Sequence, residues 1–423
     1  MSPFWRIARF ATCEAAILLI GTTVNLVPWP AFGQVKNAYD PNVVRKVADQ
    51  GDVVAQLLLG AMYYEGRGVS QNYAEAARWY RKAAEQGNVV AQFVLGAMYN
   101  KGQGVPQNYV EAARWYRKAA EKGHVGAQFD LGFMYEQGRG VSQNYAEAAR
   151  WYRVAADHGD AVAQFFLGSL YAEGHGVPED AAAAVRWYRK AADQSNAEAQ
   201  FNLGDMYVIG VGVSQDYAEA VRWYRNAADQ GHTRAQYRLA SMFDLGQGVS
   251  QDYAEAARWL RRAADQGYAD AQSDLALRYC LGQGVAEDYA EAASWYRRAA
   301  DQGNLFAQDS LGDMYRDGHG VVQDYTEAAR WYRKAADQGS SSAQNGLGSM
   351  FYSGHGVPQD YVQAYMWMNL AASSARGPFQ KTFAQNRDRV AGKMTSQQIA
   401  EGQRLTREWK PNTGAAPGGR PTN

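Results

Sequence analysis

The sequence predicts an all-α protein, a right-handed superhelical α/α solenoid of nine helix-turn-helix repeats with capping helices at both ends. Three observations predict it. A 36-residue period runs from 51 to 374 without insertion or deletion, two apolar stripes recur in each period, and a glycine pair separates them. A helix pair of this size cannot bury its apolar face alone, so stacked copies must share one core.

The first half of each repeat predicts a helix, here called helix A. Counted from the first residue of a repeat, positions 5, 9, 12 and 13 are mostly alanine, leucine, methionine and tyrosine. In repeat 2, residues 87–122, they are Ala91, Leu95, Met98 and Tyr99. At 100° per residue these positions share one arc, which we expect to be buried.

The second half predicts helix B, with a tyrosine and alanine stripe at positions 23, 26, 27, 30, 33 and 34. Gly102 and Gly104, at positions 16 and 18, lie where helix A must end and the chain must reverse. Asn108 with Glu111 three residues later is a typical helix start. Position 29 is tryptophan in all nine repeats, and we expect its ring to fill the gap to a neighbouring repeat.

Both ends of the array predict caps. Residues 34–50 form the N-terminal capping segment, because Val43, Val44, Val47 and Ala48 align with apolar positions of helix B. In repeat 9, Met366 and Leu370 replace the usual surface cations of helix B, so a further segment must cover them. We assign that role to 375–410, with one helix over 380–393 and a second that begins at a capping box of Thr395 and Gln398 and runs to Trp409.

The N-terminal segment 1–33 is typical of a secretory signal. Arg6 and Arg9 precede an apolar stretch over 15–27, and a small-x-small triplet predicts cleavage before Gln34. An uncleaved membrane anchor is the alternative, because Glu14 lies beside the apolar stretch. Cleavage predicts a periplasmic or secreted protein with no stable membrane span. Residues 411–423 are rich in glycine and proline and predict a disordered tail.

Charge and residue spacing exclude several function classes. The 43 Lys and Arg balance 43 Asp and Glu, which disfavours nucleic-acid binding. The Gly-x-Gly pairs follow a helix rather than a strand, so we predict no nucleotide or other cofactor. His175, His319 and His355 recur one or more repeats apart, too far to share one zinc ion. We therefore predict no metal-ligating or catalytic residues and no enzyme activity.

Two further groups receive structural interpretations. The arginines at positions 28 and 31 lie one helical turn from glutamates, which favours a solvated outer face over a phosphate site. If the signal is cleaved, Cys13 leaves with it and Cys280 is the only remaining thiol. The mature chain then contains no internal disulfide, and Cys280 is either inert or pairs between molecules.

The recurring Ala-Gln-x-x-Leu-Gly-x-Met-Tyr, Gly-x-Gly-Val and Ala-x-Arg-Trp-Tyr-Arg-Lys-Ala-Ala pattern resembles the Sel-1-like repeat family, relatives of tetratricopeptide repeats. The resemblance implies a scaffold or adaptor, in bacteria often exported and tied to envelope signalling, exopolysaccharide regulation or host interaction. Some relatives carry a disulfide in each repeat and bind β-lactams, but this chain lacks those cysteines and any Ser-x-x-Lys. An envelope hydrolase or β-lactam-binding protein is the alternative.

The expected binding surface is the variable face of helix A. Positions 4, 7, 11 and 14 vary most and cluster opposite the buried arc, on the face that is concave in tetratricopeptide-like solenoids. Its early repeats are aromatic and its late repeats acidic, so the expected ligand of this monomeric protein is a protein or peptide with apolar and basic ends. The alternative is that the phenylalanines pack against the adjacent helix. The candidate protein-binding residues are Leu57, Phe93, Phe129, Phe133, Phe165, Phe201, Asp205, Tyr237, Asp270, Asp309 and Asp313.

Overall fold

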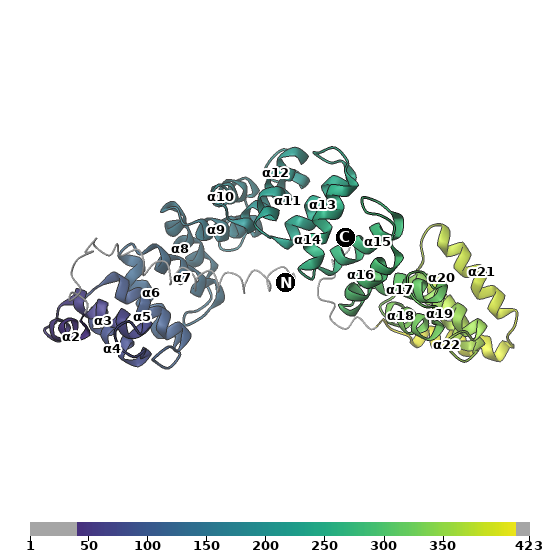
Figure 1. Ribbon diagram of the computed structural model, residues 1–423, viewed down its shortest axis with the longest axis horizontal. Helices are drawn as coiled ribbons and strands as arrows, with labels where there is room; N and C mark the ends of the chain where they lie inside the picture. The colour runs from purple at the N-terminus through teal and green to yellow at the C-terminus, as the bar shows by residue number, and fades with distance from the viewer. Residues whose placement is uncertain (1–39, 412–423) are drawn as a thin grey trace. The chain divides into compact units, whose positions relative to one another are not determined.

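The computed structural model describes residues 40–411, which contain 21 helices and no strand. Within these residues, contacts divide the chain into two compact units, 40–230 and 231–411. We call them the N-terminal unit and the C-terminal unit. In each unit, antiparallel helix pairs follow one another in chain order, as Figure 1 shows. The predictions for 1–33 and for the tail after residue 411 lie outside the described residues.

Each repeat supplies one helix A and one helix B, as predicted. The helix A segments are α3 (Val53–Glu65), α5 (Val89–Lys101), α7 (Val125–Gln137), α9 (Ala161–Glu173), α11 (Ala197–Ile209), α13 (Thr233–Leu245), α15 (Ala269–Leu281), α17 (Leu305–Asp317) and α19 (Ser341–Ser353). The helix B segments are α4 (Tyr73–Glu85), α6 (Tyr109–Glu121), α8 (Tyr145–Asp157), α10 (Ala181–Asp193), α12 (Tyr217–Asp229), α14 (Tyr253–Asp265), α16 (Tyr289–Asp301), α18 (Tyr325–Asp337) and α20 (Tyr361–Ser374).

Local residues determine where the helices begin and end. Helix α5 begins after Asn88, whose side chain accepts a hydrogen bond from the Ala91 amide, and ends at Gly102 in the left-handed region. Helix α6 begins after Asn108, which accepts from the amides of Val110 and Glu111. The predicted helix start is thus confirmed, while the Glu111 carboxylate pairs with Arg114 at 3.3 Å.

The second loop glycine is required by two constraints. Gly104 has a φ of +71°, and a Cβ added there would lie 2.7 Å from the Ala74 amide nitrogen and closer still to the Tyr73 carbonyl. Position 18 therefore lies directly against the first turn of helix B in the preceding repeat. Any side chain at this point would separate the two repeats.

The core follows the predicted stripes. Ala91, Leu95 and Met98 are buried in α5, and the position-29 tryptophans are buried in eight repeats, with Trp187 partly exposed. A glycine at position 10 lets the helix B tyrosine approach closely, as Gly96 does for Tyr116. In repeat 6 both partners change together, to Ala240 and Leu260.

A buried glutamine at position 6 links the two helices of each repeat. Its amide donates to a carbonyl at the end of the preceding helix B, and its oxygen accepts from the glutamine at position 36, as Gln56 does from Gln86 at 2.8 Å. Repeat 9 carries Ser374 at position 36, whose hydroxyl donates to Gln344 Oε1 at 3.5 Å, while repeats 2 and 3 carry Lys122 and His158. Consequently Gln92 Oε1 and Gln128 Oε1 have no hydrogen-bond partner within 40–411.

Helices are present at the three places where caps were expected. Helix α2 (Pro41–Asp49) packs against α3 through buried Val44 and Ala48. Helices α21 (Pro378–Ala391) and α22 (Ser396–Glu408) both pack against α20, where Met366 and Leu370 are buried. The predicted capping box of Thr395 and Gln398 opens α22.

Candidate functional site: the helix A face

The tyrosine at position 30 of helix B supports the exposed face of helix A from below. Its ring packs on the position-10 glycine, and its hydroxyl reaches polar residues of helix A. Tyr224 donates to Asp205 at 2.5 Å, Tyr188 to Ser169 at 3.1 Å, and Tyr332 to Asp313 at 2.5 Å. Polar side chains on the helix A face are thus fixed by hydrogen bonds from the buried helix B tyrosines.

The predicted aromatic groove is corrected in the N-terminal unit. Phe93, Phe165 and Phe201 are only 9%, 8% and 1% exposed, and Phe129 is partly buried. Each ring lies 5.5 to 5.9 Å from the position-30 tyrosine of its own repeat. The alternative, in which the phenylalanines pack as core, therefore describes their position, because position 7 lies over that tyrosine.

The neighbouring candidates are also partly packed. Leu57 packs against the hydrophobic core, and Phe133 lies 6.4 Å from Phe129. In the C-terminal unit, Tyr237 donates to Asp274 at 3.0 Å, and its ring lies 5.1 Å from the tilted ring of Tyr268.

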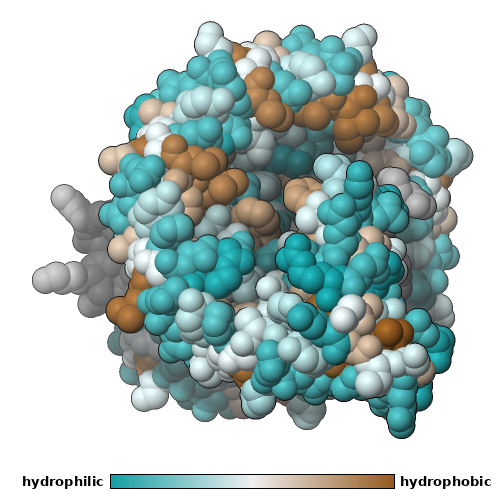
Figure 2. Space-filling model, turned by 90° about the vertical axis from the view of Figure 1, so that its right-hand side faces the viewer, coloured by the Kyte–Doolittle hydropathy of each residue, from teal (hydrophilic) through white to brown (hydrophobic). Residues whose placement is uncertain are grey.

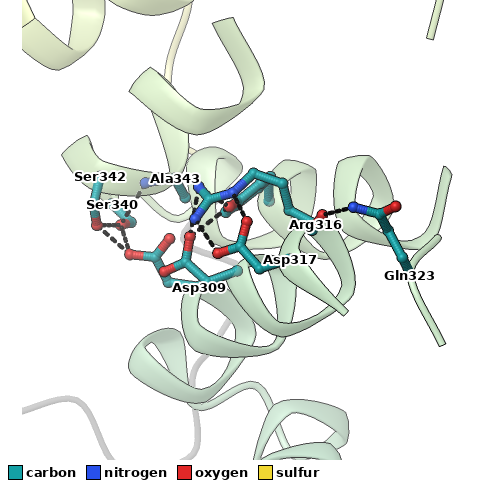
Figure 3. Close-up of polar contacts among 9 residues, drawn as sticks. Asp309, Arg316, Asp317, Gln323, Ser340, Ser342 and Ala343 are labelled. Carbon is teal, nitrogen blue, oxygen red and sulfur yellow. Dashed lines mark hydrogen bonds and ion pairs between the residues drawn. The ribbon is translucent and has the colours of Figure 1, made fainter. Parts of the chain in front are cut away.

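Two of the three candidate aspartates of the C-terminal unit are exposed, and the third, Asp309, is partly buried. Asp270 is exposed and accepts from Asn304 at 3.0 Å. Asp309, on α17, accepts from Ser340 at 3.2 Å and from Ser342, both at the start of α19 (Figure 3). Burial raises the pKa of Asp309 above its usual value. Asp313, one turn further along α17, is exposed.

An arginine that the sequence did not single out contacts two carboxylates of α17. Arg316 contacts Asp313 at 2.8 Å. It also donates two hydrogen bonds, of 2.8 and 2.7 Å, to the Asp317 carboxylate (Figure 3). This pairing lowers the pKa of Asp317. The signal for this group was the unusual basic residue at position 14 between two acidic positions of the same helix.

Position 15 of helix A was also missed by the sequence argument. Its side chain is exposed in eight of the nine repeats, and its chemistry changes along the chain: Glu65, Lys101, Glu173, Ile209, Leu245, Leu281, Asp317 and Ser353. Variation within this column was visible in the sequence. Its exposure was not, because position 15 lies close to the glycine where the helix ends.

Two carboxyl groups of α7, in the N-terminal unit, contact helix B tyrosines. Burial raises the pKa of Asp130 to about 7, opposed by its hydrogen bond to Tyr116. One and a half turns further, buried Glu136 accepts from Tyr152 at 2.6 Å. This pair resembles the Tyr–carboxylate contacts of the other repeats, so a structural role accounts for it.

The remaining candidates have structural explanations. The imidazoles of His175, His319 and His355 lie 4.8 to 5.4 Å from tyrosine rings of the preceding repeat. Residues 40–411 hold no cluster of His, Cys, Asp or Glu fit for a metal ion. Arg278, which replaces the helix A methionine, is buried and pairs with Asp244. Cys280 is a free, partly buried thiol whose pKa is raised by burial.

The outer face of helix B differs in character from the helix A face. Arginines at position 28 pair with glutamates one turn earlier, as Arg78 does with Glu75 at 2.7 Å and Arg222 with Glu219 at 2.7 Å. A shallow pocket of about 360 Å³ lies between α14 and α15, lined by Arg258, Trp259 and Tyr279 among others. Seen from the capped end of the C-terminal unit, the surface is largely hydrophilic with separate hydrophobic patches (Figure 2).

Together these features define a helical repeat protein of the class that serves as an interaction scaffold. The family model of the Sel1 repeat matches nine consecutive segments, 53–88, 89–124, 125–160, 161–196, 197–232, 233–268, 269–304, 305–340 and 341–375. The chain belongs to the Sel1 repeat family. The resemblance seen in the sequence is thereby confirmed, and no enzyme family is detected.

Two solved structures support the assignment. The chain is 34% identical to c5321, a protective antigen of uropathogenic Escherichia coli with an SLR fold, over 89% of each chain with a TM-score of 0.59. It is 38% identical to a Sel1 repeat protein from Oxalobacter formigenes, over 73% of this chain and 89% of that one, with a TM-score of 0.60. No curated protein matches the chain. Among the described residues, every helix is too short or too polar to cross a membrane.

Proposed function

We propose that this protein is an exported scaffold or adaptor without chemistry of its own, which binds another protein through the helix A face. The observation that carries the proposal is the contrast between two exposed columns. Position 28 of helix B is arginine in seven of nine repeats, whereas position 15 of helix A changes from charged to apolar to polar on an unchanged backbone. A surface of varied chemistry on a constant frame is suited to recognising one particular partner.

The partner is a protein or peptide, and the chain acts as a monomer. The exposed side chains of this face include apolar and charged residues side by side, which is the mixture that protein interfaces use. The N-terminal signal over 1–33 supports export to the periplasm or beyond the cell. Envelope signalling, exopolysaccharide regulation and host interaction are the roles we propose, and a relative described as a protective antigen supports the last.

Photocrosslinking in the native cell tests the proposed face. A photoreactive residue is placed at Glu173, Leu281 or Asp313 on helix A, and at Arg186 or Ser294 on the outer face of helix B as matched controls. All five positions are exposed. We expect protein adducts at helix A sites and none at the controls. Adducts confined to the controls would refute the proposal. N-terminal sequencing of the same material tests export, with Gln34 expected as the first residue.

A further inference from the structure

Helix A presents a ridge formed by positions 7, 11 and 15, because residues four apart lie one above another on a helix. Two consecutive repeats of the C-terminal unit have ridges of contrasting chemistry. On α15 the ridge is Ser273, Leu277 and Leu281, here called the leucine ridge. On α17 it is Asp309, Asp313 and Asp317, here called the aspartate ridge.

The leucine ridge exposes apolar surface. Leu277 is 36% exposed and Leu281 is 54% exposed, and Phe306 at the start of α17 is also exposed. Leucine is normally buried at helix surfaces that meet a core, so adjacent exposed leucines indicate an interaction site. No other part of α15 covers these two leucines, because the buried arc of α15 lies on the opposite side of the helix.

The aspartate ridge carries net negative charge. Its three carboxylates make contacts with hydroxyls of Ser340, Ser342 and Tyr332 and with one cation, Arg316. Three carboxylates and one guanidinium leave a net negative charge, which a cationic partner would offset. The nearby pair of Arg278 and Asp244 is already neutral.

We propose that the surface formed by these two ridges binds an amphipathic helix of the partner, whose apolar stripe packs on the leucine ridge and whose Lys or Arg stripe pairs with the aspartate ridge. This inference rests on the proposed function and specifies its partner. Consecutive helix A segments lie on the order of 10 Å apart, which matches the width of about 10 Å of one helix with its side chains. Ridges spaced by four residues also interdigitate with the same ridges of a docked helix.

A buried hydroxyl on the leucine ridge supports the site. Ser273 is 2% exposed, and its hydroxyl has no hydrogen-bond partner within the part of the chain that is described. An unsatisfied buried hydroxyl is unfavourable, and a polar group of a docked segment that reached it would satisfy it. The corresponding residue of α17, Asp309, is satisfied by two serines.

Fluorescence anisotropy with two synthetic peptides tests the proposal on the full chain. Both are labelled 18-residue helices of leucine, lysine and alanine with identical composition. In one, the leucine and lysine stripes are adjacent, and in the other they lie on opposite faces. We expect the adjacent-stripe peptide to bind about tenfold more tightly, with an affinity that falls as salt is raised.

Matched variants locate the binding. Asp313→Asn with Asp317→Asn, and separately Leu277→Ser with Leu281→Ser, are expected to weaken the adjacent-stripe peptide about tenfold. Asp265→Asn with Asp301→Asn removes the same charge from the exposed ends of α14 and α16 and is expected to leave binding unchanged. Leu281→Ser alone guards against misfolding of the double leucine variant, because Leu281 is more exposed than Leu277 and its loss spares the core.

The outcomes separate this proposal from the proposed function. Equal binding of the two peptides, or equal loss in the Asp265 and Asp301 variant, would show only nonspecific attraction and would overturn the partner chemistry. If photocrosslinking still yields adducts at helix A sites, the scaffold function stands, but the proposed partner chemistry does not. If no helix A site yields an adduct, the scaffold function itself fails.

Discussion

Gly104→Ala offers the sharpest test of how the repeats are joined. The substitution forces alanine into a left-handed φ of +71°, which costs about 1–2 kcal/mol. It also places a Cβ 2.7 Å from the Ala74 amide nitrogen, where real Cβ atoms do not come within 3.0 Å. The contacted atoms belong to the backbone of α4 rather than to a flexible side chain, so the overlap adds about 1–3 kcal/mol. We expect a total of about 3 kcal/mol.

Gly102→Ala and Gly123→Ala separate the two contributions. Gly102 has a φ of +72° and its added Cβ would lie 3.2 Å from the nearest atom, while Gly123 has a φ of +88° with no atom within 4 Å. Both variants meet the backbone strain and little or no overlap. We therefore expect each to cost about 1–2 kcal/mol, clearly less than Gly104→Ala.

Native-state hydrogen exchange measured by mass spectrometry is the assay, because a repeat array need not unfold in one step. Amides of α4 and of the loop around Gly104 are expected to exchange about 100-fold faster in Gly104→Ala, which corresponds to about 3 kcal/mol. Circular dichroism verifies that each variant is folded. Equal exchange in Gly104→Ala and Gly102→Ala would show that the close approach of the two repeats is not what requires glycine at position 18.

Three further predictions follow from the same packing. Lys122→Gln is expected to stabilise α5 by up to about 1 kcal/mol, because the new amide can donate to both Gly87 O and the unpaired Gln92 Oε1. Gln86 makes the equivalent two hydrogen bonds in repeat 1, to Gly51 O and Gln56 Oε1. Slower amide exchange in α5 would confirm the prediction. Asp130 has a folded pKa of about 7 against an ordinary value of 3.8, so the folded state holds its proton longer and stability falls as pH rises from about 4 to about 7. Asp130→Asn is expected to reduce the dependence of the urea unfolding midpoint on pH in this range. An unchanged pH dependence would show that other groups cause it. Arg278→Ala is expected to lower the free energy of unfolding in urea by about 2 kcal/mol, because it leaves Asp244 without its buried partner. Arg258→Ala, which removes an exposed arginine, is expected to cost under about 0.5 kcal/mol. Equal costs would show that burial of Arg278 does not make its ion pair more important than an exposed one.

The fold was predictable because its determinants repeat. Nine copies of one pattern average out local ambiguity, and each signal has a local cause: Asn108 caps α6, Gly102 ends α5, and Thr395 with Gln398 opens α22. The caps were predictable for the same reason, since Met366 and Leu370 interrupt two columns that are mostly cationic in the other repeats.

The exposure of the binding face was not predictable to the same degree. Position 7 lies opposite the buried arc on a helical wheel, yet Phe201 is almost fully buried. A helical wheel treats helix A in isolation, whereas this position lies over the helix B tyrosine of its own repeat. Position 15, which the wheel did not select, is instead the most consistently exposed variable column.

The sequence by itself determined the repeat length, the helix boundaries, the turn glycines and the family, because these depend on interactions between residues close together in the chain. The tertiary structure alone decided which variable residues are exposed and how Arg278 comes to pair with Asp244, 34 positions earlier in the chain. These properties depend on contacts between repeats, and such contacts depend on the shape and packing of neighbouring helices rather than on the order of residues within one helix.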